Sequence, residues 1–313
     1  MTDLVTVFGA SGFIGRYVVQ ELAARGARIR AVTRDPHTAQ FLKPLTALGQ
    51  LGYAKARLSS EKEVRAACEG ATAVINLVGI LDGSDEEFGA LHREGARRIA
   101  EAAAGAGAAS MIHVSAIGAD AGLEDGPAYA RSKGEGEEAV RKAFADATIV
   151  RPSIVFGPED EFLNRFARLI RVAPIMPIVA PDARFQPVYV NDLAAGISEA
   201  ALHPDIHGGQ TYEVGGPDVV TMRELMHYIA RTIGRDISMP EVPDALTGTL
   251  SKVFGWMPGA PITHDQYLML QRPSVVSGPN GLSALGVQPT PVQAVAPNWL
   301  VRYRKQGRFT QMA

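Results

Sequence analysis

One short stretch decides the fold of this chain: Leu4-Val5-Thr6-Val7-Phe8-Gly9-Ala10-Ser11-Gly12-Phe13-Ile14-Gly15. It begins with an apolar, β-branched run typical of a buried strand, and it ends where a helical pattern starts. Between the two, Gly9 permits a sharp turn, Gly12 lets the backbone approach a pyrophosphate, and Gly15 allows the helix to pack closely on the strand. The N-terminus of that helix offers unpaired N–H groups to phosphates. The stretch therefore predicts a strand-turn-helix unit that binds a dinucleotide.

The alternation of strand and helix continues through the first half of the chain. Apolar runs predict strands at 28–32, 73–78, 111–114 and 148–150, and helical patterns lie between them at 61–68, 86–106 and 128–144. Strands that alternate with helices imply right-handed crossovers and a parallel sheet covered on both faces. We therefore expect an α/β fold with a Rossmann-like, doubly wound parallel sheet.

Proline marks a change of character near residue 150. Only three of the 20 prolines precede it, at positions 36, 44 and 127. Regular elements tolerate little proline, so the later part should be rich in loops. We expect an NAD(P)-binding Rossmann domain over 1–150, and a smaller, proline-rich C-terminal lobe over 151–313 that is partly continuous with the Rossmann sheet. In that lobe the pattern predicts a strand near 185–190 and helices at 192–202 and 222–233.

The composition excludes several classes of protein. The chain has 31 Lys and Arg against 33 Asp and Glu, a formal net charge of −2, so no nucleic-acid partner is expected. A single cysteine, Cys68, excludes an intramolecular disulfide, and no metal site is predicted because Pro204 breaks the helix between His203 and His207. No apolar run reaches the roughly 20 residues of a membrane span. The start resembles no targeting segment, so we expect a cytoplasmic protein, with bacterial origin favoured.

The end of the second predicted strand selects the nucleotide. An acidic residue there would bind a ribose 2′-hydroxyl, whereas Arg34 can pair with a 2′-phosphate. NADP(H) is therefore the preferred cofactor, and Asp35, the next residue, leaves NAD(H) as the alternative. The glycine spacing is similar to that of extended and atypical short-chain dehydrogenase/reductases.

Tyr129 and Lys133 lie four residues apart at the start of a predicted helix, so both face the same side. They resemble the short-chain dehydrogenase pair in which the lysine binds the nicotinamide ribose and lowers the pKa of the tyrosine, a general acid or base. A Ser or Thr past the preceding strand normally polarises the substrate carbonyl. Here Ser115 follows that strand, but Ala116-Ile117 stand about where extended families place the hydroxyl. Tyr129, Lys133 and Ser115 are the candidate catalytic residues of a site that should bind nucleotide well and turn over poorly.

Further segments extend the resemblance over nearly the whole chain. They are His113-Val114-Ser115, the run from Arg151 to Phe166 with its Phe162-Leu163-Asn164-Arg165-Phe166 core, Gln186-Pro187-Val188-Tyr189-Val190, and Leu285-Gly286-Val287-Gln288-Pro289-Thr290-Pro291 ahead of the basic Arg302-Tyr303-Arg304-Lys305. Together these segments resemble the NAD(P)H-binding accessory subunit family of respiratory complex I, in its bacterial relatives.

This resemblance implies an accessory or assembly subunit of respiratory complex I (NADH:ubiquinone oxidoreductase) that holds its cofactor structurally with little or no turnover. It implies peripheral-arm subunits as partners and a peripheral position on the cytoplasmic face of the inner membrane. The segment 246–257 is a candidate either for membrane contact or for a lid, and the basic C-terminal residues either contact anionic headgroups or end in solvent. The implied cofactor ligands are Gly9, Ser11, Gly12, Phe13, Ile14, Gly15, Arg34, Leu77, Val78, Gly79, Val114, Tyr129, Lys133, Pro152, Ser153 and Ile154.

The alternative is an NADP-dependent reductase or epimerase of the extended or atypical short-chain dehydrogenase class. It would act on a small molecule such as a quinone or isoprenoid precursor. In that case Tyr129 would be the acid or base and Lys133 the ribose anchor.

Overall fold

The computed structural model describes residues 3–123, 126–243, 248, 264–305 and 307, and the chain divides into two compact units. The first unit comprises Met1–Pro152, Val190–Val214 and Ser277–Gln288; the second comprises Ser153–Tyr189, Gly215–Val276 and Pro289–Ala313. Both units are therefore discontinuous in the sequence. The segment 246–257 lies, except for Gly248, outside the described residues.

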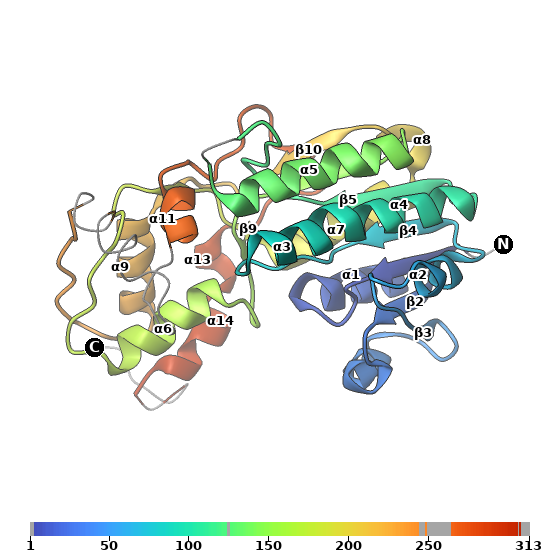
Figure 1. Cartoon of the computed structure of the whole chain (residues 1–313). Helices are drawn as coiled ribbons and strands as arrows, with labels where there is room; N and C mark the ends of the chain where they lie inside the picture. Colours follow the sequence, from blue (N-terminus) through green and yellow to red (C-terminus); the bar gives the residue numbers. More distant parts are fainter. Residues whose placement is uncertain (1–2, 124–125, 244–247, 249–263, 306, 308–313) are drawn as a thin grey trace. The chain divides into compact units, whose positions relative to one another are not determined.

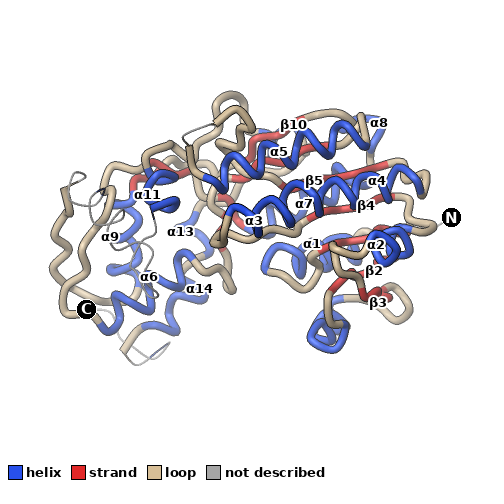
Figure 2. Tube along the Cα trace, viewed as in Figure 1, coloured by secondary structure: helices blue, strands red, loops and turns tan. Residues whose placement is uncertain are grey.

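A parallel sheet of seven strands forms the centre of the first unit (Figure 2). The strands lie in the order β10-β6-β5-β4-β1-β2-β3, and every pairing between them is parallel. Their bounds are β1 Leu4–Phe8, β2 Arg28–Thr33, β3 Leu51–Lys55, β4 Ala73–Asn76, β5 Ser110–Val114, β6 Thr148–Pro152 and β10 Thr211–Val214. The Rossmann-like α/β fold predicted from the sequence is confirmed. The two edge strands, β3 and β10, were not predicted from the sequence.

Helices cover both faces of this sheet (Figure 1). On one face α1 packs against α7, and on the other α4 packs between α2 and α5. The helices of the first unit are α1 Phe13–Ala24, the 3₁₀ segment η1 Pro36–Leu45, α2 Glu61–Cys68, α3 Asp85–Phe88, the π-helical segment η2 Gly89–Gly95, α4 Ala96–Gly105, α5 Ala128–Ala143, α7 Val190–Leu202, α8 Pro204–His207 and α12 Gly281–Ala284. The helix predicted at 86–106 is thus two α-helical pieces joined by a π-helical turn.

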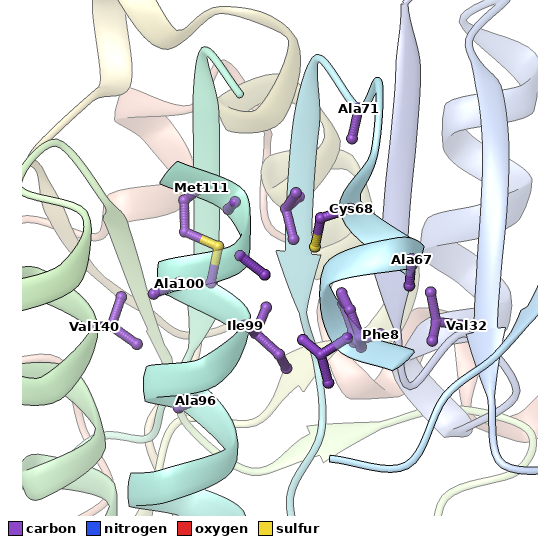
Figure 3. Packing of buried hydrophobic residues seen from close by; sticks show 14 of the residues in the cluster. Phe8, Val32, Ala67, Cys68, Ala71, Ala96, Ile99, Ala100, Met111 and Val140 are labelled. Carbon is purple, nitrogen blue, oxygen red and sulfur yellow. The ribbon is translucent and has the colours of Figure 1, made fainter. Parts of the chain in front are cut away.

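One hydrophobic core of the first unit lies between the sheet and α2, α4 and α5 (Figure 3). Phe8, Ile99, Met111 and Val140 meet there, each at most 1% exposed. Cys68 is fully buried in the same core, and burial raises the pKa of its thiol to about 12. The cysteine therefore acts as a small apolar core residue.

The second unit is mainly helical, with two small two-stranded sheets. Its elements are β7 Val155–Phe156, α6 Phe162–Val172, β8 Arg184–Phe185, β9 Val188–Tyr189, β11 Val220–Thr221, α9 Met222–Thr232, α11 His264–Leu270, α13 Val292–Val295, α14 Pro297–Leu300 and the 3₁₀ segment η3 Val301–Tyr303. Phe156, Leu163, Ile229 and Trp299 belong to its core. In the described part of the chain, no helix has both the length and the hydrophobicity that crossing a membrane requires.

The Phe162-Leu163-Asn164-Arg165-Phe166 segment builds the second unit rather than a reaction centre. The Asp160 carboxylate accepts the backbone N–H of Leu163 at 2.6 Å, and the Asn164 amide donates to the Asp160 carbonyl at 2.9 Å. The Tyr303 hydroxyl donates to Asn164 Oδ1 at 2.9 Å. Because these polar groups are buried, their mutual hydrogen bonds fix the start of α6 against η3.

Candidate functional site

The glycine turn after β1 has the geometry of a phosphate cradle. Gly9 has a φ of +81°, and its carbonyl oxygen accepts the Gly12 N–H at 3.0 Å. A Cβ on Gly15 would lie 2.2 Å from the Gly9 oxygen, so only glycine fits there. No described side chain caps α1 at Gly12, and the first turn of α1 contains no acidic residue. The first N–H groups of α1 are therefore available to an anion.

Three further predicted ligands belong to this turn. Ser11 is half-buried within it, and Phe13 and Ile14 open α1, both half-buried. The Phe13 ring meets the Tyr17 ring edge-on, with centroids 6.1 Å apart. All three thus lie at the carboxyl edge of the sheet, the edge where parallel α/β folds bind ligands.

The loop after β2 separates the two candidate nucleotide selectors. The Asp35 carboxylate accepts the His37 N–H at 3.0 Å and caps η1. Arg34 is exposed, and its guanidinium makes no ion pair with the described residues. Arg16, in the first turns of α1, lies with its guanidinium 4.9 Å from the centre of the Phe41 ring. Arg34 is thus exposed and can pair with an incoming phosphate.

The loop after β4 runs directly beside the glycine turn. The Leu77 N–H donates to the Phe8 carbonyl at 3.0 Å, and a Cβ on Gly9 would lie 3.2 Å from the Leu77 carbonyl carbon. The Val78 N–H donates to the Asn76 side chain at 3.0 Å. A Cβ on Gly79 would lie 3.8 Å from Lys133 Nζ. The Leu77-Val78-Gly79 segment therefore connects the phosphate end of the candidate site to the Tyr129–Lys133 end.

Ser115 follows β5 at the same edge. Its N–H donates to the Val150 carbonyl at 2.8 Å, but its buried hydroxyl has no hydrogen-bond partner among the described residues. A buried hydroxyl without a partner is costly, which suggests a ligand group as its partner. Beyond it, the Ile117 N–H donates to the Pro152 carbonyl at 3.1 Å. Ala116 and Ile117, which follow Ser115, carry no side-chain hydroxyl.

Tyr129 and Lys133 lie one turn apart on α5, as expected. The Lys133 ammonium is buried and donates to the Val114 carbonyl at 2.7 Å, and burial lowers its pKa to about 8. Burial raises the pKa of the Tyr129 phenol to about 12. The phenol is therefore a weak proton donor in this arrangement, and one of the three N–H groups of the lysine is bound to backbone.

The last three predicted ligands fall on both sides of the division between units. Pro152 ends β6 in the first unit, whereas Ser153 and Ile154 belong to the second. The Ser153 hydroxyl donates to the Ser274 carbonyl at 2.6 Å, and the Ile154 carbonyl accepts the Val188 N–H at 2.9 Å. Ser153 and Ile154 are thus engaged within the second unit.

Sequence reasoning missed a buried polar network next to this edge. It contains His92 and Ser132, and on the neighbouring strands Asn76 and His113, all at most 5% exposed. The Asn76 amide donates to His113 Nδ1 at 3.1 Å. An amide that interrupts the apolar run of β4 was a usable signal for Asn76. A single histidine inside a helix gave no such signal for His92.

The arrangement as a whole suits a dinucleotide. Parallel strands bring the glycine turn, Arg34, Leu77, Ser115 and the α5 pair to one edge. The N–H groups of the first three residues of α1 and the Ser115 hydroxyl are donors in need of partners. Within the described ranges, no three His, Cys, Asp or Glu side chains gather as metal ligands would.

Comparison with known proteins agrees with this geometry. A protein-family profile described as NAD(P)H-binding matches residues 9–161. The mitochondrial NADH dehydrogenase [ubiquinone] 1 alpha subcomplex subunit 9 of Rattus norvegicus is 34% identical over 96% of this chain and 80% of its own length. The mitochondrial 40 kDa subunit of NADH-ubiquinone oxidoreductase of Neurospora crassa is 30% identical over 97% of this chain and 80% of its own length.

Two proteins with lower sequence identity are also similar to this chain, one in sequence and one in structure. A ceramide reductase of Caulobacter vibrioides is 29% identical over 77% of this chain and 74% of its own length. The crystal structure of an NADPH-dependent quinone oxidoreductase of Escherichia coli with NADPH superposes with a TM-score of 0.74, covering 95% of this chain and 99% of that one at 19% identity. At that identity, the structural likeness supports the fold alone.

Proposed function

Because the chain belongs to the family of NADH dehydrogenase [ubiquinone] 1 alpha subcomplex subunit 9 and carries an NAD(P)H-binding domain, we propose that it is an accessory or assembly subunit of respiratory complex I that holds NADPH structurally. The observation that carries this proposal is the similarity over 96% of the chain. That similarity extends through the second unit, whereas the NAD(P)H-binding profile matches only residues 9–161. Peripheral-arm subunits of the complex are the proposed partners.

The residues at the carboxyl edge of the sheet fit the proposed cofactor. The turn from Gly9 to Gly15 would hold the pyrophosphate, with backbone donors from α1. Val78 and Gly79, together with Val114 and Ser115, would flank the nicotinamide half, which Tyr129 and Lys133 would anchor. The bound nucleotide would supply a hydride.

The preference for NADP(H) rests on the loop after β2. The Asp35 carboxylate already caps η1 through Oδ1 at 3.0 Å, so part of the group that could accept a ribose 2′-hydroxyl is engaged in the loop. Arg34 is exposed and would pair with a 2′-phosphate.

The proposal of little or no turnover rests on three groups. The Lys133 ammonium donates to the Val114 carbonyl, burial raises the pKa of Tyr129, and no side-chain hydroxyl is present at Ala116-Ile117. A carbonyl substrate would therefore lack a polarising donor at the position where extended families place it.

We also place the protein at the cytoplasmic face of the membrane that carries the complex, in contact with it through α6. This helix exposes Leu169 and Val172 beside the exposed arginines at positions 165, 168 and 171. Arg168 pairs with Glu161 at 2.9 Å, and the C-terminal Arg302 and Arg304 donate to backbone carbonyls. Apolar and basic side chains on one surface suit anionic lipids, at about 1 kcal/mol per basic residue. Binding to vesicles with anionic lipid, lost in Val172→Glu and absent with neutral lipid, tests this contact.

One experiment tests the main proposal. The protein is purified at endogenous level from its host without added cofactor, and native gels and mass spectrometry then follow its partners and its nucleotide. We expect it to migrate with complex I or an assembly intermediate and to release NADPH. A protein that carries no nicotinamide nucleotide and never migrates with the complex would contradict the proposal.

The second candidate function is an NADP-dependent reductase, favoured by the similarity to the ceramide reductase. In that case a deletion strain would keep normal complex I but accumulate a carbonyl metabolite. Wild type would restore the normal level of this metabolite, and Tyr129→Phe would not, because the phenol would be the proton donor. Restoration by both would reject this candidate.

A further inference from the structure

His92 is a buried polar side chain at the nicotinamide end that the proposed function leaves without a role. It lies in η2, the π-helical turn between α3 and α4, and is 1% exposed. Figure 1 shows α3 and α4 side by side with α5, and η2 contacts α5 closely. A π-helical turn adds a residue to the helix and often occurs at functional sites. Here it carries His92 into the space between the loop after β4 and α5.

The two ring nitrogens of His92 bind different elements. The Ile80 N–H, in the loop after β4, donates to Nε2 at 3.0 Å. Nδ1 lies 2.9 Å from the Ser132 hydroxyl, which itself donates to the Tyr129 carbonyl at 2.8 Å. Because the Ser132 hydroxyl already donates its hydrogen to the Tyr129 carbonyl, it can only accept from His92. Nδ1 is therefore the donor and Nε2 the acceptor. The network thus assigns a neutral ring protonated at Nδ1.

Ring contacts and close packing hold His92 in this position. It stacks on Phe88 with centroids 5.4 Å apart, and it meets the Tyr129 ring edge-on at 5.6 Å. A Cβ on Gly136 would lie 2.3 Å from the His92 carbonyl oxygen, and one on Gly79 would lie 3.4 Å from Nε2. Glycines on both sides therefore let α5 and the loop approach the ring.

The electrostatic surroundings agree with a neutral ring. Burial, and to a lesser extent the Lys133 ammonium, lowers the pKa of His92 to about 3. Protonation would place a hydrogen on Nε2, which must accept from Ile80. The ring can therefore bridge the two elements only as the neutral form.

We propose that His92 is a positioning residue that holds the loop Leu77–Ile80 and the Tyr129–Lys133 turn of α5 at a fixed separation, and so orients the nicotinamide half of the cofactor. It contacts neither the phosphate cradle nor Arg34. This inference rests on the proposed function, because it requires that the edge of the sheet binds NADPH.

The test compares two ligands on the full-length protein by isothermal titration. NADPH reports on the whole site, and 2′-phospho-ADP lacks the nicotinamide together with its ribose. In His92→Phe the ring contacts remain but both hydrogen bonds are lost, so NADPH should bind about tenfold more weakly. The fragment should bind within about twofold of wild type, because its contacts are separate. Hydrogen exchange of the Ile80 amide should become faster in the free variant.

Two further variants keep the proposal falsifiable. Ser132→Ala removes only one of the two hydrogen bonds of the His92 ring, together with the bond from Ser132 to the Tyr129 carbonyl. It should shift NADPH affinity in the same direction by a smaller factor, which matters if His92→Phe does not fold. His207→Phe is the matched control: His207 is also buried, at 3%, but lies beside Thr148 at the opposite edge of the sheet. It should leave both affinities unchanged.

Equal loss of both ligands in His92→Phe would indicate a general structural role and overturn the proposal. Unchanged NADPH affinity would overturn it as well. If wild type binds neither ligand, the proposed function itself fails, and the inference falls with it.

Discussion

Arg34 and Asp35 are neighbours in the chain, but their side chains have opposite surroundings. The carboxylate is used as a helix cap at 3.0 Å, whereas the guanidinium is exposed. Sequence alone left the two residues as competing selectors of the nucleotide. Only the folded loop shows which of them is already engaged, because a cap depends on where η1 begins.

Arg34→Ala should weaken NADPH binding by a factor on the order of 10 to 100, since a charge-assisted pair with the 2′-phosphate would be lost. NADH affinity should stay nearly the same. Titration of both nucleotides measures the ratio. Arg28→Ala is the control, because Arg28 is equally exposed at the opposite end of β2. A parallel loss of NADH affinity would contradict the assigned role.

His92 should make stability depend on pH below neutrality. Burial lowers its pKa from the ordinary 6.5 to about 3, so between these values the unfolded chain binds a proton that the folded chain does not. The stability is fully present above pH 6.5, and the free energy of unfolding should fall by about 1.4 kcal/mol per pH unit below it. Urea unfolding of wild type and His92→Phe at several pH values measures the difference in slope. Parallel curves would show that His92 is not held neutral.

At the level of elements, central strands were predictable and edge strands were not. β1, β4 and β5 are buried on both faces and read as apolar runs, which the sequence shows directly. β3 and β10 lie at the two edges of the sheet, and their sequences Leu-Gly-Tyr-Ala-Lys and Thr-Tyr-Glu-Val mix polar and apolar residues. Their pairing depends on a neighbour strand far away in the chain.

The same distinction applies to the candidate site. The glycine turn and the pair Tyr129 and Lys133 follow from spacing within one element, so the sequence predicts where they lie. The role of His92 depends on a π-helical turn and on contacts to two distant segments. A π-helical turn adds one residue to a helix, and this changes the composition and the apolar pattern too little for the turn to be predicted from the sequence.

The close approach of α5 to η2 predicts a specific glycine requirement. Gly136→Ala should destabilise the protein by about 1 to 3 kcal/mol, because its Cβ would lie 2.3 Å from the His92 carbonyl oxygen. Gly105→Ala is the matched control at the end of α4, where a Cβ meets nothing within 4 Å. That variant should be neutral or stabilise by up to about 1 kcal/mol. Chemical denaturation measures both, and equal effects would argue against the tight contact.

At the level of the whole molecule, the first unit is assembled from three separate segments. Residues 190–214 supply β10 and α7, and 277–288 supply α12, which packs on β10. The proline distribution predicted a domain boundary near residue 150. It could not show that the chain comes back to the first unit after that boundary, because composition does not record which later segments pack on an earlier sheet. The sequence predicted that the C-terminal lobe is partly continuous with the sheet, but it did not show which segments of the lobe join it.

The fragment 1–152 should therefore fail to fold on its own, although it contains the glycine turn and six of the seven strands. It lacks α7, whose Leu193, Ala194, Ile197 and Ala201 are each at most 2% exposed and cover one face of the sheet beside α1. Exposing that face removes a large part of the hydrophobic stabilisation of the unit, and net stabilities are small. We expect no cooperative urea transition and no NADPH binding by the fragment, measured against the full chain by circular dichroism and titration. A cooperative transition with the midpoint of the full chain would mean that α7 and β10 are dispensable for the nucleotide-binding unit.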